Sequence, residues 1–258
     1  MRDTTTRVLI AQGLTKIYGS RGRAVTRALN NLSLAVDRGE FVGIMGPSGS
    51  GKTTLLNLLA TIDRPTSGTV TVEGRDTSRM SERELALFRR KRLGFVFQDF
   101  NLLDSLTLRE NMALPLVLDR QPPSLIRQRV EALAQRLGIQ HVLDRFPDEV
   151  SGGEQQRAAA GRAVIHEPAL VLADEPTGNL DSRSSQAFME ILRDLNESLN
   201  VTIVMVTHDP FAASYCSRVL FIRDGALYNE IHRGDGRQAF FQQILDVLAL
   251  LGGGSGGH

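Results

Sequence analysis

Residues 46–53 of this 258-residue chain read GPSGSGKT and match the pattern G-x-x-x-x-G-K-[ST]. An apolar run at 41–45 precedes them and predicts a buried strand, and the run at 54–59 predicts a helix. Glycines let successive backbone N–H groups of such a loop converge on phosphate oxygens, and the positive end of the following helix points to the same place. This order of strand, loop and helix therefore predicts an α/β fold with a phosphate-binding loop.

The polar side chains of this loop indicate a nucleotide with a metal ion. Lys52 is expected to neutralise β- and γ-phosphate oxygens, and the Thr53 hydroxyl to ligate Mg²⁺. The alternative, a glycine-rich turn that matches by chance, is disfavoured by the flanking strand and helix. The predicted nucleotide-binding residues of this segment are Gly46, Ser48, Gly49, Ser50, Gly51, Lys52, Thr53 and Thr54.

Two further apolar runs end in residues that suit phosphate chemistry. The run at 169–173 ends at Asp174, which could reach the metal, and at Glu175, which is placed to polarise an attacking water as a general base. The competing interpretation is an acidic strand exit that caps a helix. The run at 201–207 ends at His208, whose imidazole could donate a hydrogen bond to the γ-phosphate. A lone histidine after a strand is usually structural, so His208 gains weight only from these neighbours.

Composition excludes some classes of function. A hydrophobic content of 41% with 23% charged residues is ordinary for a folded chain, and the length fits one large domain or two small lobes. The formal net charge of +1 provides no field for steering nucleic acid, so no nucleic-acid partner is expected. One cysteine, Cys216, fits a reducing compartment. Since no signal peptide or membrane span is apparent, we expect a cytoplasmic chain.

The distribution of strand and helix patterns predicts the layout of the chain. Alternating apolar positions between residues 8 and 72 suggest an antiparallel sheet beside a parallel core, and helical patterns follow residue 98. Strands and helices alternate again up to residue 224, as in a doubly wound parallel sheet. We predict one domain over 1–251, with a catalytic core at 1–98 and 158–230, a helical subdomain at 99–157, a C-terminal helix at 231–251 and a flexible Gly/Ser tail at 252–258.

A second motif, Ser-Gly-Gly, stands at residues 151–153, upstream of Asp174 and Glu175. With this motif the chain resembles the ATPase subunit of an ABC transporter, and the resemblance extends from residue 8 to about residue 225. It implies a P-loop NTPase (RecA-like) core with a parallel sheet, an antiparallel β subdomain and an inserted α-helical subdomain. It also implies that Tyr18 stacks on adenine and that Gln98 contacts Mg²⁺ or water and reports to the membrane partner. Residues 178–181, including Asp181, would cross a dimer interface.

The signature segment, residues 150–154, departs from the usual L-S-G-G-Q of this family. It has Val150 in place of leucine and Glu154 in place of glutamine. Because the serine and the glycine N–H groups at a helix start make most of the anion contact, we expect Glu154 to point away from the phosphate.

The resemblance further implies that two copies close head to tail over two ATP molecules, so that the signature of one copy meets the γ-phosphate held by Lys52 of the other. The implied cofactors are ATP and Mg²⁺. The implied catalytic residues are Glu175, His208, Lys52 and Gln98. The implied metal ligands are Thr53, Gln98 and Asp174. The implied additional nucleotide contacts are Tyr18, Ser151, Gly152, Gly153, Glu154 and Asp181.

Several segments indicate which group of ABC transporter ATPases the chain resembles. Residues 95–107 and 174–181 are similar to the group of macrolide-export, lipoprotein-release and cell-division ATPases, whereas 159–163, 205–216 and 238–245 look most like the ATPase of bacitracin-resistance transporters. This implies antimicrobial-peptide resistance and sensing at the cytoplasmic face of the membrane, with an integral-membrane permease and, through it, a sensor histidine kinase. The alternative is a macrolide-export, lipoprotein-release or cell-division mechanotransmission complex. Residues 100–108 are apolar enough to form part of a permease-binding groove, and the competing interpretation is surface packing within the helical subdomain. Residues 238–245 are open to a simpler interpretation as an amphipathic helix packed on the core.

Overall fold

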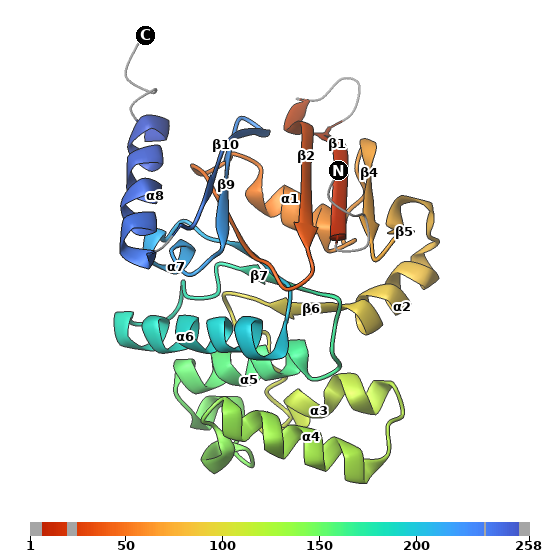
Figure 1. Cartoon of the computed structure of the whole chain (residues 1–258). Coiled ribbons are helices and arrows are strands. Elements are labelled where there is room, and N and C mark those ends of the chain that lie inside the picture. Colours follow the sequence, from red (N-terminus) through yellow and green to blue (C-terminus); the bar gives the residue numbers. More distant parts are fainter. Residues whose placement is uncertain (1–6, 20–24, 235, 253–258) are drawn as a thin grey trace.

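The computed structural model describes residues 7–19, 25–234 and 236–252, and it contains a larger sheet built on buried apolar strands (Figure 1). Its strand order is β10-β9-β3-β8-β7-β6, and every neighbouring pair is parallel except β9 with β10. The strands are β3 (Phe41–Met45), β6 (Leu93–Val96), β7 (Leu170–Asp174), β8 (Ile203–Val206), β9 (Arg218–Arg223) and β10 (Ala226–His232). Continuous apolar runs suit these strands because helices and a second sheet cover both faces.

The predicted antiparallel sheet is present beside this core, in the order β2-β1-β4-β5. Its strands are β1 (Arg7–Tyr18), β2 (Thr26–Asp37), β4 (Ser67–Val72) and β5 (Arg75–Asp76). Helix α1 (Lys52–Leu59) directly follows the phosphate loop, and its four leucines are buried in a cluster that joins both sheets. The predicted strand, loop and helix over 41–59 are therefore confirmed.

Arg218 on β9 links the two sheets through a buried ion-pair network. Only 8% of the residue is exposed, and its guanidinium lies 3.0 Å from Glu40 and 2.8 Å from Glu230. The same group donates a hydrogen bond to the carbonyl of Ala35 on β2. The orientation of the antiparallel sheet on the parallel core thus depends partly on one cation.

The segment between β6 and β7 is helical, as expected. It holds α3 (Leu108–Leu118), α4 (Pro123–Arg136), α5 (Gly152–Val164) and the short 3-10 turns η2 (Gln140–Val142) and η3 (Pro147–Glu149). The predicted boundary between residues 157 and 158 falls inside α5. This helix packs on β6 so closely that a Cβ atom on Gly94 would lie 2.1 Å from the carbonyl of Ala163. Helix α5 therefore belongs to both parts of the molecule.

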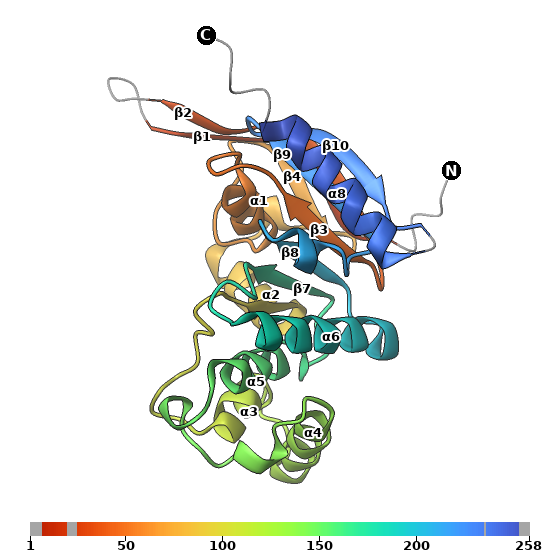
Figure 2. The ribbon, with the colours of Figure 1, turned by 90° about the vertical axis from the view of Figure 1, so that its left-hand side faces the viewer.

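The remaining helices are α2 (Glu82–Arg92), α6 (Ser182–Leu199), α7 (Pro210–Ala213) and α8 (Arg237–Gly252), with a 3-10 turn η1 (Thr77–Arg79). The prediction of a C-terminal helix from residue 231 is wrong at its start, because Ile231 and His232 pair with β9 and the helix begins at Arg237. Helix α8 lies along β10 (Figure 2) and buries four apolar side chains, which confirms the amphipathic packing interpretation. Gly252 ends this helix, and the rest of the predicted tail lies outside the described residues.

None of the helices in the part of the chain that the structure describes has both the length and the apolar character needed to traverse a lipid bilayer.

Candidate functional site

The sheet topology brings the predicted site residues to one edge. Strands β3, β8, β7 and β6 are adjacent in that order and parallel. The phosphate loop follows β3, and His208 follows β8. Asp174 ends β7 with Glu175 directly after it, and Gln98 follows β6. Because carboxyl ends of parallel strands share one edge of a sheet, four separate sequence segments meet there.

The phosphate loop depends on glycine geometry. Gly51, the N-cap of α1, has φ 104°, and a Cβ atom there would lie 2.4 Å from the carbonyl of Ala28. Gly49 has φ 77°, and among the described residues nothing lies within 4 Å of the place a Cβ atom would take. Gly51 therefore allows the loop to pack against β2, and Gly49 leaves an open side that a phosphate can approach.

Lys52 lies over this loop. Its Nζ donates to the carbonyls of Gly46 at 2.9 Å and Pro47 at 3.0 Å. The Ser50 hydroxyl oxygen is buried and has no hydrogen-bond partner among the described residues. Buried polar groups normally find a partner, so this hydroxyl is an exception within the phosphate loop.

The charges at the sheet edge influence one another. Burial lowers the pKa of Lys52, while Glu175 and Asp174 act against that shift. Burial raises the pKa of Asp174, the neighbouring Glu175 raises it further, and Lys52 opposes both effects. One ammonium group and two carboxyl groups therefore share a site that desolvation affects, which is typical of catalytic centres.

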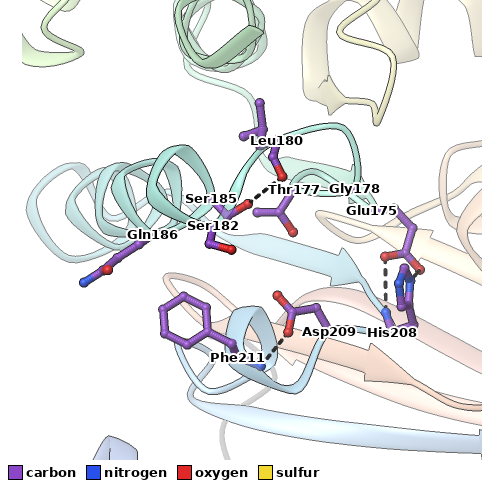
Figure 3. A pocket seen from close by; sticks show the side chains of 10 residues that line it. All are labelled: Glu175, Thr177, Gly178, Leu180, Ser182, Ser185, Gln186, His208, Asp209 and Phe211. Atoms are coloured by element: carbon purple, nitrogen blue, oxygen red, sulfur yellow. Dashed lines mark hydrogen bonds and ion pairs between the residues drawn. The ribbon is translucent and has the colours of Figure 1, made fainter.

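Glu175 is held in a strained position and faces His208 (Figure 3). Its backbone has φ 45°, a left-handed conformation that is uncommon for residues other than glycine. One carboxylate oxygen lies 3.0 Å from His208 Nδ1, and the other accepts a hydrogen bond of 3.2 Å from the His208 backbone N–H. Both residues line a pocket of about 480 Å³ that also reaches Gly178 and Leu180.

Gln98 joins a hydrogen-bond network that the sequence analysis missed. Its Nε2 donates to Asn179 Oδ1 at 3.0 Å, and Asn179 Nδ2 donates to Asp99 Oδ1 at 2.7 Å. The loops that follow β6 and β7 are therefore tied together beside the pair formed by Glu175 and His208. Nothing in the residue pattern identified Asn179 as the partner of Gln98, because the two are 81 residues apart.

Tyr18 lies at the end of β1 with 41% of its surface exposed. Its hydroxyl donates to Asp63 at 2.8 Å, and the Lys16 ammonium lies 4.9 Å from the ring centroid. Burial raises the pKa of Tyr18, the hydrogen bond with Asp63 raises it further, and an interaction with Thr54 opposes them. The exposed ring therefore lies next to the helix that follows the phosphate loop.

Ser151, the first residue of the Ser-Gly-Gly motif, is the N-cap of α5 in a capping box. The Glu154 carboxylate accepts hydrogen bonds from the Ser151 N–H at 2.9 Å and from its hydroxyl at 2.6 Å. The Glu154 carboxylate thus turns back onto the signature serine, while its expected position relative to a bound phosphate stays a prediction. The spacing Ser-x-x-Glu was a sequence signal for this geometry.

Within one protomer, the signature packs next to the loop that precedes α6. A Cβ atom on Gly152 would contact Phe100 and Leu180, and one on Gly153 would contact Ser184. Asp181 caps α6 through the N–H groups of residues 183 and 184, and the Ser184 hydroxyl lowers its pKa. Helix α5, which the signature begins, and α1, which the phosphate loop begins, lie on opposite sides of β6 and β7 in both Figure 1 and Figure 2.

Gln156 is a buried residue that the sequence analysis did not single out. None of its surface is exposed, and its Nε2 donates to the carbonyls of Phe97 at 3.1 Å and Pro176 at 2.6 Å. The Gln156 amide on α5 thus connects two loops through hydrogen bonds: Phe97 precedes Gln98, and Pro176 follows Glu175. A glutamine in a polar run carries no sequence signal of burial.

An apolar groove of about 360 Å³ lies between α3 and the exit of β6, and Phe95, Phe97, Leu114, Pro115 and Leu118 are among its lining residues. None of residues 100–108 is among its lining residues, and their role in a permease-binding groove stays a prediction. The Phe100 ring instead lies 3.4 Å from the place where a Cβ atom on Gly152 would stand.

Among residues 7–19, 25–234 and 236–252, no cluster of three or more histidine, cysteine, aspartate or glutamate residues could hold a metal ion by itself. Mg²⁺ needs only one or two protein ligands when phosphates and waters supply the rest. The hydroxyl of Thr53, the carboxyl of Asp174 and the amide of Gln98 are oxygen donors at the same sheet edge, so their chemistry fits this ion.

Comparison with known proteins gives a consistent result. A model of the ABC transporter family matches residues 29–178. The chain is 54% identical to the ABC transporter ATP-binding protein YxdL of Bacillus subtilis over 95% of each chain, and 49% identical to the bacitracin export ATP-binding protein BceA of Halalkalibacterium halodurans over 97% of this chain and 99% of that one.

The solved structure of a dimeric post-hydrolysis state of the ATP-binding cassette MJ0796, bound to ADP and Pi, superimposes on this chain with a TM-score of 0.79 at 38% identity, over 88% of this chain and 100% of that one. Together with the phosphate loop and the carboxylates at the sheet edge, these findings mean that the chain belongs to the ABC transporter family, as an ATP-binding subunit that hydrolyses ATP.

Proposed function

We propose that two copies of this chain close head to tail over two ATP molecules, and that each ATP is cleaved between the phosphate loop of one copy and the signature of the other. ABC cassettes dimerise and act with membrane permeases. The observation that carries the proposal is that α1 and α5 lie on opposite sides of β6 and β7, so that one protomer supplies only half of the contacts. The solved dimer with ADP and Pi supports it.

In this mechanism the side chains at the sheet edge act on the γ-phosphate. Lys52 exchanges its two carbonyl partners for phosphate oxygens, and Glu175 takes a proton from the attacking water as general base. His208 holds the Glu175 carboxylate through two contacts and is exposed on its other side, where it can donate to the phosphate. Mg²⁺ held by Thr53, Asp174 and Gln98 would neutralise charge on the β- and γ-oxygens.

The remaining proposed contacts involve the adenine of ATP and the dimer interface. The exposed ring of Tyr18, beside the start of α1, would stack on adenine. Across the interface, Ser151 and the N–H groups of Gly152 and Gly153 would contact the γ-phosphate at the positive end of α5. The loop that ends at Asp181, which adjoins the signature in the same protomer, would pass along the dimer interface.

Mixing two inactive variants tests the head-to-tail arrangement. Lys52→Ala inactivates a protomer's own phosphate loop, and Ser151→Arg blocks the signature that it lends. A mixed dimer has one site with both defects and one intact site, so a 1:1 mixture should regain up to about a quarter of wild-type phosphate release under statistical pairing. If each site were built within one protomer, the mixture would stay inactive, and that result would overturn the proposal.

For the biological role, we infer resistance to antimicrobial peptides of the bacitracin type, with a permease at the cytoplasmic face of the membrane and a sensor histidine kinase connected through it. The similarity to the bacitracin export protein over nearly the whole of both chains supports this role. A chromosomal Glu175→Gln substitution in the native host should lower the inhibitory concentration of bacitracin and not that of a macrolide. Unchanged bacitracin susceptibility, or a selective change with the macrolide, would refute the assignment.

A further inference from the structure

Polar contacts at the signature connect the side chains of Ser151, Glu154 and His141. Ser151 donates its hydroxyl hydrogen to Glu154 Oε2 at 2.6 Å, and the other carboxylate oxygen, Oε1, lies 3.2 Å from His141 Nε2. His141 lies on the separate turn η2, so this contact is tertiary and not part of the α5 cap. The Glu154 side chain is 17% exposed and that of His141 is 63% exposed. The mechanism above gives no role to either Glu154 or His141.

The first consequence concerns the Ser151 proton. A serine hydroxyl carries one hydrogen, and both a carboxylate and a phosphate oxygen can only accept it. In this structure the hydrogen goes to Glu154. Ser151 can therefore donate to a γ-phosphate only after it has released Glu154, and anything that weakens the hold of Glu154 on the hydroxyl favours the phosphate contact.

The second consequence concerns charge. Hydrogen bonds from Ser151 hold the pKa of Glu154 below its ordinary value despite burial, and the neighbouring Arg157 and His141 act in the same direction. An ionised carboxylate thus stands at the start of α5, where a phosphate would arrive. When the hydroxyl turns away, Glu154 keeps the Ser151 N–H at 2.9 Å and the contact with His141.

We propose that His141 is a positioning residue of the signature: by holding and shielding the Glu154 carboxylate, it frees the Ser151 hydroxyl for the phosphate bound by the partner protomer. This inference rests on the proposed head-to-tail dimer. It predicts that a positive charge at position 141 promotes closure and that the effect passes through Glu154.

The test measures the dissociation constant of the ATP-dependent dimer by analytical ultracentrifugation, in full-length protein that carries Glu175→Gln to slow hydrolysis. His141→Lys keeps a cation, His141→Gln keeps a neutral hydrogen-bond donor, and His141→Ala keeps neither. We expect affinity at least equal to the parent for the lysine variant and about two- to thirtyfold weaker for the glutamine and alanine variants, because an exposed ion pair contributes about 1.4- to 5-fold and the dimer contains two such pairs. His232→Gln is the matched control, because His232 lies 3.0 Å from Glu230 and is 67% exposed.

The same three substitutions are then repeated with Glu154→Gln, which retains a capping box but removes the charge. We expect the three affinities to converge there. Equal weakening with and without Glu154→Gln, weakening by the lysine variant, or the same loss in His232→Gln would overturn the role of His141. If the parent with Glu175→Gln forms no dimer at saturating ATP, the proposed function fails first. Urea unfolding of each variant identifies effects that come from lost stability.

Discussion

Replacing Gln156 with leucine should destabilise the protein by about 2–3 kcal/mol. The bond to Pro176 O is buried and the bond to Phe97 O is partly buried. Leaving a buried acceptor unpaired costs about 1–3 kcal/mol. We therefore assign a cost of about 2–3 kcal/mol to the Pro176 carbonyl and about 1 kcal/mol to the Phe97 carbonyl. Gln156 Oε1 is itself buried without a partner among the described residues, so its removal returns about 1 kcal/mol. Leucine is close to glutamine in size, which keeps any cavity term small.

The measurement is the free energy of unfolding from urea titration, and thermal unfolding should show a decrease of roughly 4–12 °C in Tm. The neighbouring Gln155→Leu is the control, because Gln155 makes only a 3.4 Å bond to Val150. The turnover of Gln156→Leu should also fall, since the two carbonyls adjoin Gln98 and Glu175. If both variants unfold at the same urea concentration, the amide does not hold the two loops and the reasoning is refuted.

Three further predictions address other parts of the molecule. Glu175→Gln should reduce phosphate release about 10²–10⁴-fold with ATP binding retained, as calorimetry can check, and near-normal turnover would contradict its role as base. Arg218→Met should cost about 3–5 kcal/mol in urea unfolding because two carboxylates lose their partner. The control Arg223→Met, at a partly exposed arginine, should cost less than about 1 kcal/mol, and similar losses would contradict this. Burial alone would raise the pKa of Glu73, but hydrogen bonds from two arginines hold it below the ordinary value. Its contribution to stability is therefore present above about pH 4.3 and lost as the pH falls through the folded-state pKa. Glu73→Gln should flatten the acid side of the stability curve, and an unchanged acid dependence would count against the ion pairs.

Much of the site could be predicted because its chemistry follows strands that the sequence shows clearly. Apolar runs ending at Met45 and Asp174, and at His208, are visible without a structure, and parallel strands bring such ends to one edge. The glycine pattern of the phosphate loop adds a requirement for positive φ, which Gly51 fulfils. These predictions succeed because each depends on a period of apolar residues or on a local conformational need.

The errors arise where the deciding contact is distant in the chain or where two local rules compete. Ile231 and His232 resemble the start of a helix, yet pairing with β9 makes them a strand. For Glu154, we considered only the anion contacts of the serine and the glycine N–H groups, whereas the Ser-x-x-Glu spacing of a capping box favours a side chain that turns back onto Ser151. The contact with His141 had no signal at all, because an exposed histidine on a short turn is compatible with many roles.

The conformation of Glu175 shows why such a site resists prediction from local preferences. A left-handed φ of 45° is disfavoured for glutamate, and a rule based on propensity would place glycine or asparagine there. The strain is maintained because the Glu175 N–H bonds Val206 O at 2.9 Å and both carboxylate oxygens contact His208. These partners lie on the neighbouring strand and just beyond it, so tertiary structure fixes a conformation that the residue alone would avoid. The carboxylate that we propose as the base is thereby directed toward the histidine, and its tertiary contacts outweigh the local conformational preference of glutamate.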